Sequence, residues 1–289
     1  MTATIDRPAT APAAPPRRRT ARRAGRVALC LWLVAIGVFV LAPLVTIMGA
    51  SFGDQPFFRF PPSGWTLDPY RRLFGDAEAV QSLWVSFASA VLAGLTGCVL
   101  GLLVALAIVR SRRGVNHGLA AAMLLPLMIP HIALGAALYV VYIRLGIPFS
   151  TVTLAFAQLV LVLPFSVRSL MGAIQGLDTG VERAAMSLGA RPYQVGWRVT
   201  LPALRSGLAV AFVLGFSTSF DDAAIALFIN SPTSTNMPVR LLGYLEGEVG
   251  PFIAAGGSVL LCAGFLIVTV IGRLIGIGRA FGIKERDGR

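Results

Sequence analysis

The sequence contains few charged residues and only one lysine. Charged residues make up 13% of the 289 positions, hydrophobic residues make up 56%, and the mean hydropathy is +0.76. A soluble domain of ordinary composition has about a quarter of its residues charged. The deficit therefore excludes an ordinary soluble protein and indicates a polytopic membrane protein.

The scarcity of lysine also restricts the chemistry of the chain. A phosphate-binding loop of the form G-x-x-x-x-G-K-[ST] needs a lysine that reaches the β and γ phosphates, and the single lysine, Lys284, follows Ile283. We find no catalytic carboxylate pair outside the apolar runs, no histidine cluster and no nucleophile elbow. The chain is thus predicted to have no catalytic site, not to be an enzyme, and to bind no cofactor itself.

The cysteines indicate no metal site. Cys30, Cys98 and Cys262 are widely separated and all fall inside long apolar runs. This spacing does not match that of metal ligands, and we interpret the three residues as small packing residues.

Six apolar runs are long enough to cross a hydrocarbon layer, for which about 20 residues suffice. We predict an all-α membrane protein with six transmembrane helices. The predicted spans are Val27–Ala50, Leu83–Val109, Gly118–Ile143, Thr151–Leu170, Gly207–Ile229 and Phe252–Ile275.

Arginine positions predict the orientation of these spans, because short loops rich in Lys and Arg stay on the cytoplasmic side. Twenty Lys and Arg residues fall before the first span, after the second, between the fourth and fifth or after the sixth, counting Arg168 and Arg273 at the ends of the fourth and sixth spans, whereas five fall in the other loops. Both termini are therefore predicted to be cytoplasmic. The net charge of +12 reflects this topology, and we expect no binding of nucleic acid.

A patterned polar segment, residues 181–202, separates the fourth and fifth spans. Val181, Ala184, Ala185 and Leu188 recur at helical spacing and predict a short amphipathic helix. Gly189 is suited to end that helix in the left-handed conformation. A second helix is predicted to start at Pro192 and run through Tyr193, Trp197 and Val199, and Pro202 is predicted to end the unit.

This segment resembles the cytoplasmic loop of the permease subunits of bacterial ATP-binding-cassette importers, the MetI-like family. The family pattern is Glu-Ala-Ala, three residues, Gly, nine residues, then Ile-x-Leu-Pro. The matching positions are Ala184, Ala185, Gly189, Val199, Leu201 and Pro202. Arg183 occupies the position of the family glutamate, and Glu182 lies one residue earlier, so the ion-pair chemistry of that glutamate is left open.

The resemblance implies that this segment couples the chain to an ATPase that binds ATP and Mg. The residues implied are Glu182, Arg183, Ala184, Ala185, Gly189, Ala190, Leu201 and Pro202. The other implied partners are a homologous permease subunit, a second copy of the ATPase and an external substrate-binding protein, in the bacterial cytoplasmic (inner) membrane. The implied domains are a disordered basic tail (1–26), a six-helix permease domain (27–276) and a C-terminal tail (277–289).

Two further segments are similar to the same family. The run 125–130, with Pro126 and Pro130, resembles its third span, and the two prolines predict a bent helix because each lacks a backbone N–H. The bend either lines a pathway or only improves packing. Residues 57–74 look like the first external loop of the spermidine/putrescine-type branch.

Adjacent carboxylates interrupt the fifth predicted span. Asp221 and Asp222 follow Ser217 and Phe220, in a stretch similar to one in the spermidine/putrescine importers. An aspartate at a helix centre costs about 2.5–3.5 kcal/mol on insertion scales, so both must face protein or water. Because adjacent helical residues diverge by about 100°, we expect one to line a pathway for a cationic amine and the other to bond to neighbouring helices or cap a helix break. The alternative is a purely structural role for both.

The predicted function is therefore that of an importer permease subunit for a small cationic solute such as a polyamine. Other solutes handled by related permeases, including opines, aminoethylphosphonate, iron and amino-acid-like molecules, are alternatives. A secondary transporter would also use intramembrane carboxylates, but it would leave the 181–202 segment unexplained. A channel is a weaker alternative still. A membrane enzyme would need a cluster of catalytic groups at the interface, and none is visible.

Overall fold

The computed structural model describes residues 17–111, 115–247 and 250–275. These residues form helices, turns and loops, and the only β-type pairing among them is an isolated bridge between Gly53 and Trp65. The all-α prediction is confirmed. The chain divides into two compact units, residues 1–47 and 48–289, and each is described by itself.

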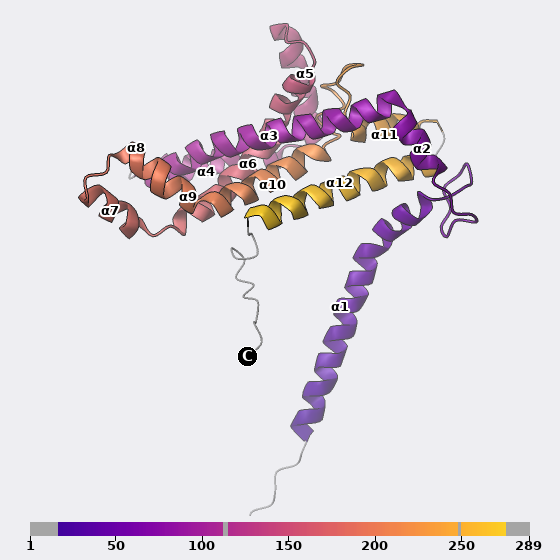
Figure 1. The fold of residues 1–289 in the computed structure, drawn as a ribbon, viewed down its shortest axis with the longest axis horizontal. Coiled ribbons are helices and arrows are strands. Elements are labelled where there is room, and N and C mark those ends of the chain that lie inside the picture. Colours follow the sequence, from indigo (N-terminus) through magenta and orange to yellow (C-terminus); the bar gives the residue numbers. More distant parts are fainter. Residues whose placement is uncertain (1–16, 112–114, 248–249, 276–289) are drawn as a thin grey trace, which may run out of the picture. The chain divides into compact units, whose positions relative to one another are not determined.

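The helices and their bounds, in chain order, are as follows (Figure 1). They are α1 (Arg17–Ala50), α2 (Asp68–Gly75), α3 (Ala77–Arg110), α4 (Val115–Leu124), the 3₁₀ turn η1 (Leu125–Met128), α5 (His131–Leu145), α6 (Thr151–Gln175), α7 (Thr179–Ser187), α8 (Pro192–Val195), the π-helical turn η2 (Gly196–Thr200), α9 (Leu201–Ala203), α10 (Arg205–Phe220), α11 (Met237–Leu245) and α12 (Pro251–Ile275).

Most of α1 belongs to the first unit. The helix begins at Arg17, so residues 17–26, which the sequence predicted to be disordered, are helical. Arginine and alanine, which dominate this stretch, are among the strongest helix formers. Residues 1–16 of the predicted N-terminal tail and the whole predicted C-terminal tail, 277–289, lie outside the described residues.

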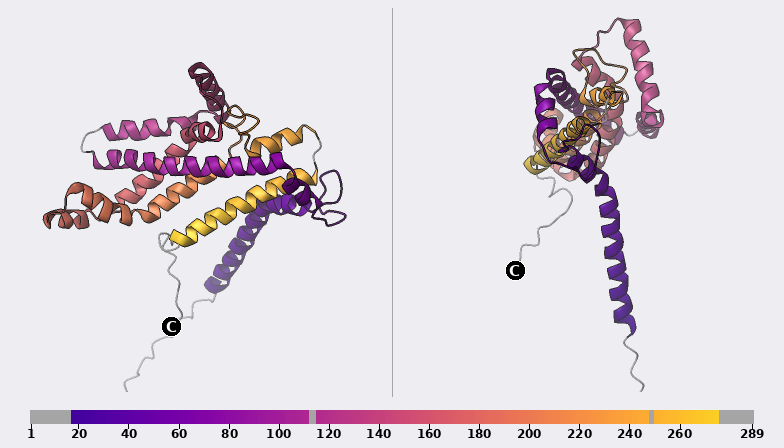
Figure 2. Two further views of the ribbon diagram at one scale, coloured as in Figure 1. Left: turned by 45° about the horizontal axis from the view of Figure 1, so that its top comes forward. Right: turned by 90° about the vertical axis from the view of Figure 1, so that its right-hand side faces the viewer.

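The core of the second unit is formed by α3, α6 and α10, and α12 packs against α10 (Figures 1 and 2). Small residues allow close approach of the three core helices, as is usual between helices in membranes. A methyl group placed on Gly97 would lie 2.5 Å from Val162 Cγ1, and one on Gly215 would lie 2.7 Å from the same atom. Helix α10 is therefore held in one register against α3 and α6.

Four described helical segments are long and apolar enough to cross a membrane by themselves. They are Ala28–Ala50, Ala77–Arg110, Thr151–Gln175 and Pro251–Arg273. They match four of the six predicted spans. Two bent pairs of helices, Gly118–Met128 with His131–Leu145 and Pro192–Ala203 with Arg205–Phe220, raise the possible number of spans to six.

The third predicted span is broken, as the two prolines indicated. Helix α4 continues into η1, the chain breaks between Met128 and His131, and α5 leaves at an angle of 98°. Pro130 lies immediately before α5, and Pro126 lies in the first turn of η1. Both positions tolerate the missing backbone N–H of proline. The bend is confirmed, whereas a single helix over 118–143 is not present.

The fifth predicted span, Gly207–Ile229, is wrong as one helix. Helix α10 ends at Phe220, and a series of turns replaces the helix over residues 221–229. The physical reason is that a side chain competes with the helix carbonyls for backbone N–H groups. The carboxylate of Asp222 accepts hydrogen bonds from the backbone N–H groups of Ile225 and Ala226, each at 3.3 Å, and so offers those donors a partner other than a helix carbonyl.

Two of the three cysteines do not pack in the core. Cys98 is buried, and its thiol donates to the carbonyl of Leu208 at 3.3 Å. Cys30 and Cys262 are exposed, so our interpretation of them as packing residues is wrong. No group of three or more His, Cys, Asp or Glu side chains within 17–111, 115–247 and 250–275 is arranged to hold a metal ion.

Candidate functional site

The segment from α7 to α9 lies at one end of the helical bundle (Figure 1). Asp178 precedes α7, and its carboxylate accepts a hydrogen bond from the Gly180 N–H at 2.7 Å, which caps the helix. At the other end, Gly189 has φ +90°, a conformation that glycine adopts without strain. The Ala190 N–H then donates to the Ala185 carbonyl at 3.1 Å, and the predicted helix end at Gly189 is confirmed.

The second helix starts at Pro192, as predicted, and the chain is helical up to Ala203. It differs from the prediction in two details, because a π-helical turn, η2, lies between α8 and α9, and Pro202 lies in the first turn of α9 rather than at the end of the unit. The Leu201 N–H donates to the carbonyl of Gly196, five residues earlier. This widened turn comes directly before Pro202, which has no N–H to donate. The chain then bends by 66° into α10.

Large apolar side chains of this segment are exposed. Leu188 is 90% exposed and Trp197 is 72% exposed, and Tyr193, Met186 and Val181 are also exposed. Of the predicted apolar stripe, Ala184 is exposed and Ala185 is partly buried. The stripe is therefore largely uncovered. Exposed apolar side chains gathered on a short polar loop are typical of a surface that binds another protein.

Glu182 and Arg183 differ in their surroundings. The Glu182 side chain is 15% exposed, and its Oε1 atom accepts hydrogen bonds from Arg110 Nη2 at 2.6 Å and from Thr200 Oγ1 at 2.5 Å. Arg183 is exposed and donates only within its own helix, from Nε to the Thr179 carbonyl at 3.3 Å and from Nη2 to Thr179 Oγ1 at 3.2 Å. The acidic residue of the loop thus contacts its own chain, and the basic one faces outward.

Asp222 is one centre of a buried polar network. Its side chain accepts from Gln158 Nε2 at 3.1 Å, in addition to the two backbone donors described above, and the residue is 7% exposed. Ser219 Oγ donates to Gln158 Oε1 at 2.6 Å, and Asn236 Nδ2 donates to the Asp222 carbonyl at 2.7 Å. These contacts join α6, the end of α10 and the start of α11. Asp222 therefore caps the helix break.

Asp221 has a different environment from its neighbour. It is exposed, and its backbone N–H donates to the Ser217 carbonyl at 3.4 Å, which ends α10. Ser217 is partly buried. Phe220 is 6% exposed and stacks on Phe216 with ring centroids 5.1 Å apart. Both rings belong to a buried cluster that contacts α3 and α12, so they do not present free aromatic faces to a solute. Of the four predicted pathway residues, Asp221 is the carboxylate that is accessible.

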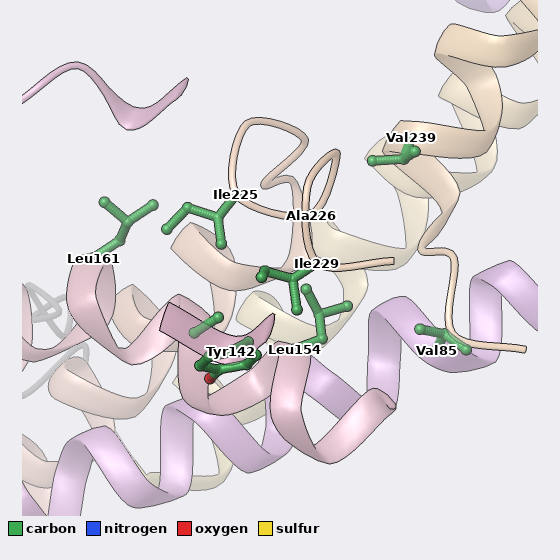
Figure 3. Close-up of a cluster of buried hydrophobic side chains, with 9 residues drawn as sticks. Val85, Tyr142, Leu154, Leu161, Ile225, Ala226, Ile229 and Val239 are labelled. Carbon is green, nitrogen blue, oxygen red and sulfur yellow. The ribbon is translucent and has the colours of Figure 1, made fainter. Parts of the chain in front are cut away.

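The turns after α10 are also held by apolar contacts. Ile225, Ala226 and Ile229 lie in one buried cluster with side chains from α3, α5, α6 and α11. Figure 3 shows Ile225 near Leu161 of α6, and Ile229 near Leu154 and Tyr142. The non-helical part of the predicted fifth span is therefore a packed element, and it keeps Asp221 in a defined position.

At the opposite end of the bundle, polar contacts join α11 to the start of α3. Tyr244 Oη donates to Asp76 Oδ2 at 2.8 Å, and Arg240 forms an ion pair with Glu78. Partial burial raises the pKa of Asp76. The hydrogen bonds from Tyr244 and from the backbone N–H groups of Glu78 and Ala79, together with the charge of Arg240, outweigh this effect, and the net pKa lies below its ordinary value. The carboxylate is ionised at neutral pH.

A cavity of about 580 Å³ lies beside this network, between the 53–72 segment and the elements α11 and α12. Its lining includes Asp54, Asp68, Arg72, Tyr244 and Phe252. Both charge signs are present in the lining, together with aromatic rings. This end of the bundle therefore presents a hollow polar surface, unlike the protruding apolar surface at the α7–α9 end.

Our reading of the sequence missed several residues that the site requires. Gln158, Ser219 and Asn236 are fully or almost fully buried; Gln158 and Asn236 donate to Asp222, and Ser219 donates to Gln158. A lone amide in an apolar span, as at Gln158, is a signal that could have revealed such a role, since polar groups in membranes seek partners. Thr200 and Arg110, which bind Glu182, lie far from each other in the sequence, and no local pattern connects them.

Comparison with known proteins gives a consistent result. Residues 97–277 match the family described as binding-protein-dependent transport system inner membrane component. The chain is 25% identical over 244 residues to the spermidine/putrescine transport system permease protein PotC of Escherichia coli (strain K12), covering 84% of this chain and 92% of PotC. It is 33% identical over 255 residues to the molybdenum transport system permease protein ModB of Mycobacterium tuberculosis, covering 83% and 91%.

The fold also has a solved counterpart. A chain of a bacterial alginate ABC transporter, crystallised in complex with an alginate pentasaccharide-bound periplasmic protein, superposes with a TM-score of 0.67. The match covers 89% of this chain and 96% of that chain at 15% sequence identity. At this identity the likeness concerns the fold alone.

Proposed function

The chain belongs to the family of binding-protein-dependent transport system inner membrane components, and from this membership we propose how it is coupled and what it carries. It is the membrane permease component of an ABC importer, and ATP hydrolysis occurs in a separate ATPase subunit. We propose that the complex contains this chain, a homologous permease subunit, two ATPase subunits that bind ATP and Mg, and an external substrate-binding protein. Transport then requires a conformational change of the permease pair.

The surface proposed to bind the ATPase is the α7–α9 segment. The observation that carries the proposal is the exposure of Leu188 and Trp197 on a capped helical loop at one end of the bundle. Apolar and aromatic anchors of this kind dominate the binding energy of protein interfaces. The predicted coupling residues Ala184, Ala185, Gly189, Ala190, Leu201 and Pro202 shape this loop, and Arg183 adds a positive charge to its outer face.

We propose that the α7–α9 segment and both termini face the cytoplasm. The support is the distribution of arginine, which is dense before the first span, after α3, between α6 and α10 and after α12. The cavity between the 53–72 segment and α11–α12 then opens to the outside, where the substrate-binding protein docks. Cysteine accessibility in intact cells, measured at positions 64 and 187 after removal of the native cysteines, tests this orientation.

The loop geometry provides a direct test of ATPase docking. We expect Gly189→Val to weaken binding of the ATPase subunit about tenfold, because a β-branched residue is strained at the φ of +90° found here. The measurement is the amount of ATPase that co-purifies with the tagged permease pair.

Gly189→Asn is the matched control for this test, since asparagine tolerates the left-handed conformation, and we expect it to retain most of the binding. Equal binding by wild type and Gly189→Val would contradict the docking role of the loop. Failure of the wild-type chain to bind an ATPase would remove the proposal as a whole and would favour a secondary transporter.

The proposed solute is a small cationic amine such as a polyamine. The support is Asp221, an exposed carboxylate at the end of α10, which can pair with an ammonium group, together with the similarity to PotC. A carboxylate in a low-dielectric pathway also repels anions. Asp222, whose carboxylate is bonded within the chain, supports the position of Asp221 and does not contact the solute.

We expect Asp221→Asn to reduce spermidine uptake at least tenfold at low substrate concentration, while the complex assembles normally. The reason is the loss of the accessible negative charge without a change in size. Asp221→Glu, which keeps the charge, should retain most of the uptake. The measurement is uptake of radiolabelled spermidine into proteoliposomes that contain the whole complex, and unchanged uptake by Asp221→Asn would refute the cation pathway.

An oxyanion importer is the second candidate, and one observation favours it. The 33% identity to the molybdenum permease ModB exceeds the 25% identity to PotC. Molybdate and spermidine uptake by the same proteoliposomes separates the two. If Asp221→Asn increased the uptake of molybdate, the chain would be an anion carrier in which the Asp221 carboxylate only repels the solute.

A further inference from the structure

Helix α7 is attached to the rest of the molecule in an unusual way. None of its residues is buried, so no apolar side chain anchors it in the bundle. The chain enters it through Asp178 and leaves it through Gly189, whose left-handed conformation directs the chain into α8. A helix that receives force from a partner needs a firm connection to the elements that it moves, and buried apolar contacts do not supply one here.

A polar connection is present at Glu182. Its Oε1 atom accepts from Arg110 Nη2, at the last residue of α3, and from Thr200 Oγ1, at the last residue of η2. Thr200 is 4% exposed, so the second contact is shielded from water. A charged acceptor shared by two donors is among the stronger types of hydrogen bond in proteins. One carboxylate oxygen thus joins α7 both to η2, which follows it closely in the sequence, and to the distant helix α3.

We propose that Glu182 is a positioning residue that connects α7 to α3 within this chain and transmits the movement of the ATPase to the membrane bundle. This inference rests on the proposed function, because it assumes that α7 is the docking helix. It gives Glu182 a role inside the permease and leaves the outer face of α7, with Arg183 and Leu188, for the ATPase.

The direction of the two charged side chains supports this assignment. Arg183 stands where the resembled family pattern has glutamate, and it is exposed and bonded only to Thr179 of its own helix. Glu182, one residue earlier, is turned by about 100° around the helix and faces Arg110. Both donors bond to Oε1 of Glu182, and the side chain is only 15% exposed, so the carboxylate is directed toward its own chain and away from the outer face of α7.

The connection reaches the packed core of the bundle. Helix α3 contacts both α6 and α10 along its length, and its glycines bring the three helices close together. A displacement of α7 that is passed to Arg110 is therefore passed to a rigid helix that ends at Ala77, on the opposite side of the membrane bundle. Without Glu182, α7 would keep its covalent links and its contacts with α8 and η2, but it would lose the charged contact with α3.

The test separates docking from transmission. We expect Glu182→Gln, Arg110→Gln and Thr200→Val each to lower the amount of substrate imported per ATP hydrolysed about fivefold or more, with ATPase binding within a factor of two of wild type. Thr200→Ser, which keeps the hydroxyl, should keep the wild-type ratio of substrate imported to ATP hydrolysed. The double variant Arg110→Glu with Glu182→Arg, which reverses the two charges, should have at least half of the wild-type ratio. Each of the two single variants should have a lower ratio than the double variant.

The control is Arg144→Gln, which removes an exposed arginine from the last turn of α5 and should leave the ratio unchanged. All measurements use the reconstituted complex with its binding protein. If Glu182→Gln releases the ATPase as strongly as a change at Leu188, Glu182 belongs to the interface and the inference is wrong. It is also wrong if Arg110→Gln leaves the ratio unchanged. Failure of wild type to bind the ATPase would instead remove the proposed function.

Discussion

Replacement of Leu188 by glutamate is expected to release the ATPase subunit from the permease, with binding weakened about 30-fold or more. Leu188 is 90% exposed, so the substitution removes no contact within this chain. Loss of a central apolar anchor typically costs at least 2 kcal/mol of binding free energy, and a buried unpaired carboxylate adds a desolvation penalty. The measurement is the dissociation constant of the purified ATPase for the permease in nanodiscs.

Leu67→Glu is the matched control for this prediction, because it makes the same chemical change at another exposed leucine, outside the α7–α9 segment. We expect it to leave ATPase binding unchanged. Unaltered binding by Leu188→Glu, with normal accumulation of the chain, would show that the exposed apolar surface of the loop is not the docking surface. A parallel loss in both variants would indicate a general effect of added charge.

Replacement of Asp222 by alanine is expected to prevent folding of the chain. The carboxylate accepts from Gln158 Nε2, which also donates to the Ser219 carbonyl, and from the N–H groups of Ile225 and Ala226. In the variant the two N–H groups lose their side-chain acceptor, and each buried donor left without a partner costs about 1–3 kcal/mol. The sum is comparable with a typical total folding stability of about 5–15 kcal/mol. We expect less than a tenth of the wild-type amount of the chain in the membrane fraction.

Asp221→Ala is the comparison that makes this result specific, since the neighbouring carboxylate is exposed. It should accumulate to nearly the wild-type level. Gln158→Leu, which removes one donor of the network and leaves Ser219 without its side-chain acceptor, should give an intermediate loss of thermal stability. If Asp222→Ala accumulated and melted like wild type, the buried network would not hold the helix break, and a direct role of Asp222 in transport would regain support.

Several elements could be predicted from the sequence because they depend on local chemistry. The end of α7 follows from the ability of Gly189 to adopt a positive φ, and the break between α4 and α5 follows from the lack of a backbone N–H at Pro126 and Pro130. Four of the six predicted spans are continuous helices, as their long apolar runs predicted. In each case, properties of nearby residues decide the outcome.

The features that were not predicted depend on contacts between distant segments. Asp222 ends a helix that hydropathy alone would continue to Ile229, because Gln158 and Asn236 stabilise the alternative turn. Phe220 is taken into the core by its contact with α12, although its position suggested a solute-facing ring. The pairing of Glu182 with Arg110 likewise joins helix α7 to the end of helix α3, and helical periodicity carries no information about it.

The break between α4 and α5 has a consequence for the biogenesis of the protein. Helix α4 has 10 residues and α5 has 15, so their lengths of about 15 Å and 22 Å both fall short of a hydrocarbon layer of about 30 Å. Neither is long enough to be accepted by the insertion machinery alone. We therefore expect the two to enter the lipid as one apolar segment, and the 98° angle to be fixed where Gly135 packs against the turn at residues 224–225. On this expectation insertion comes first and bending afterwards, with the turn beyond α10 as the surface against which the bend forms.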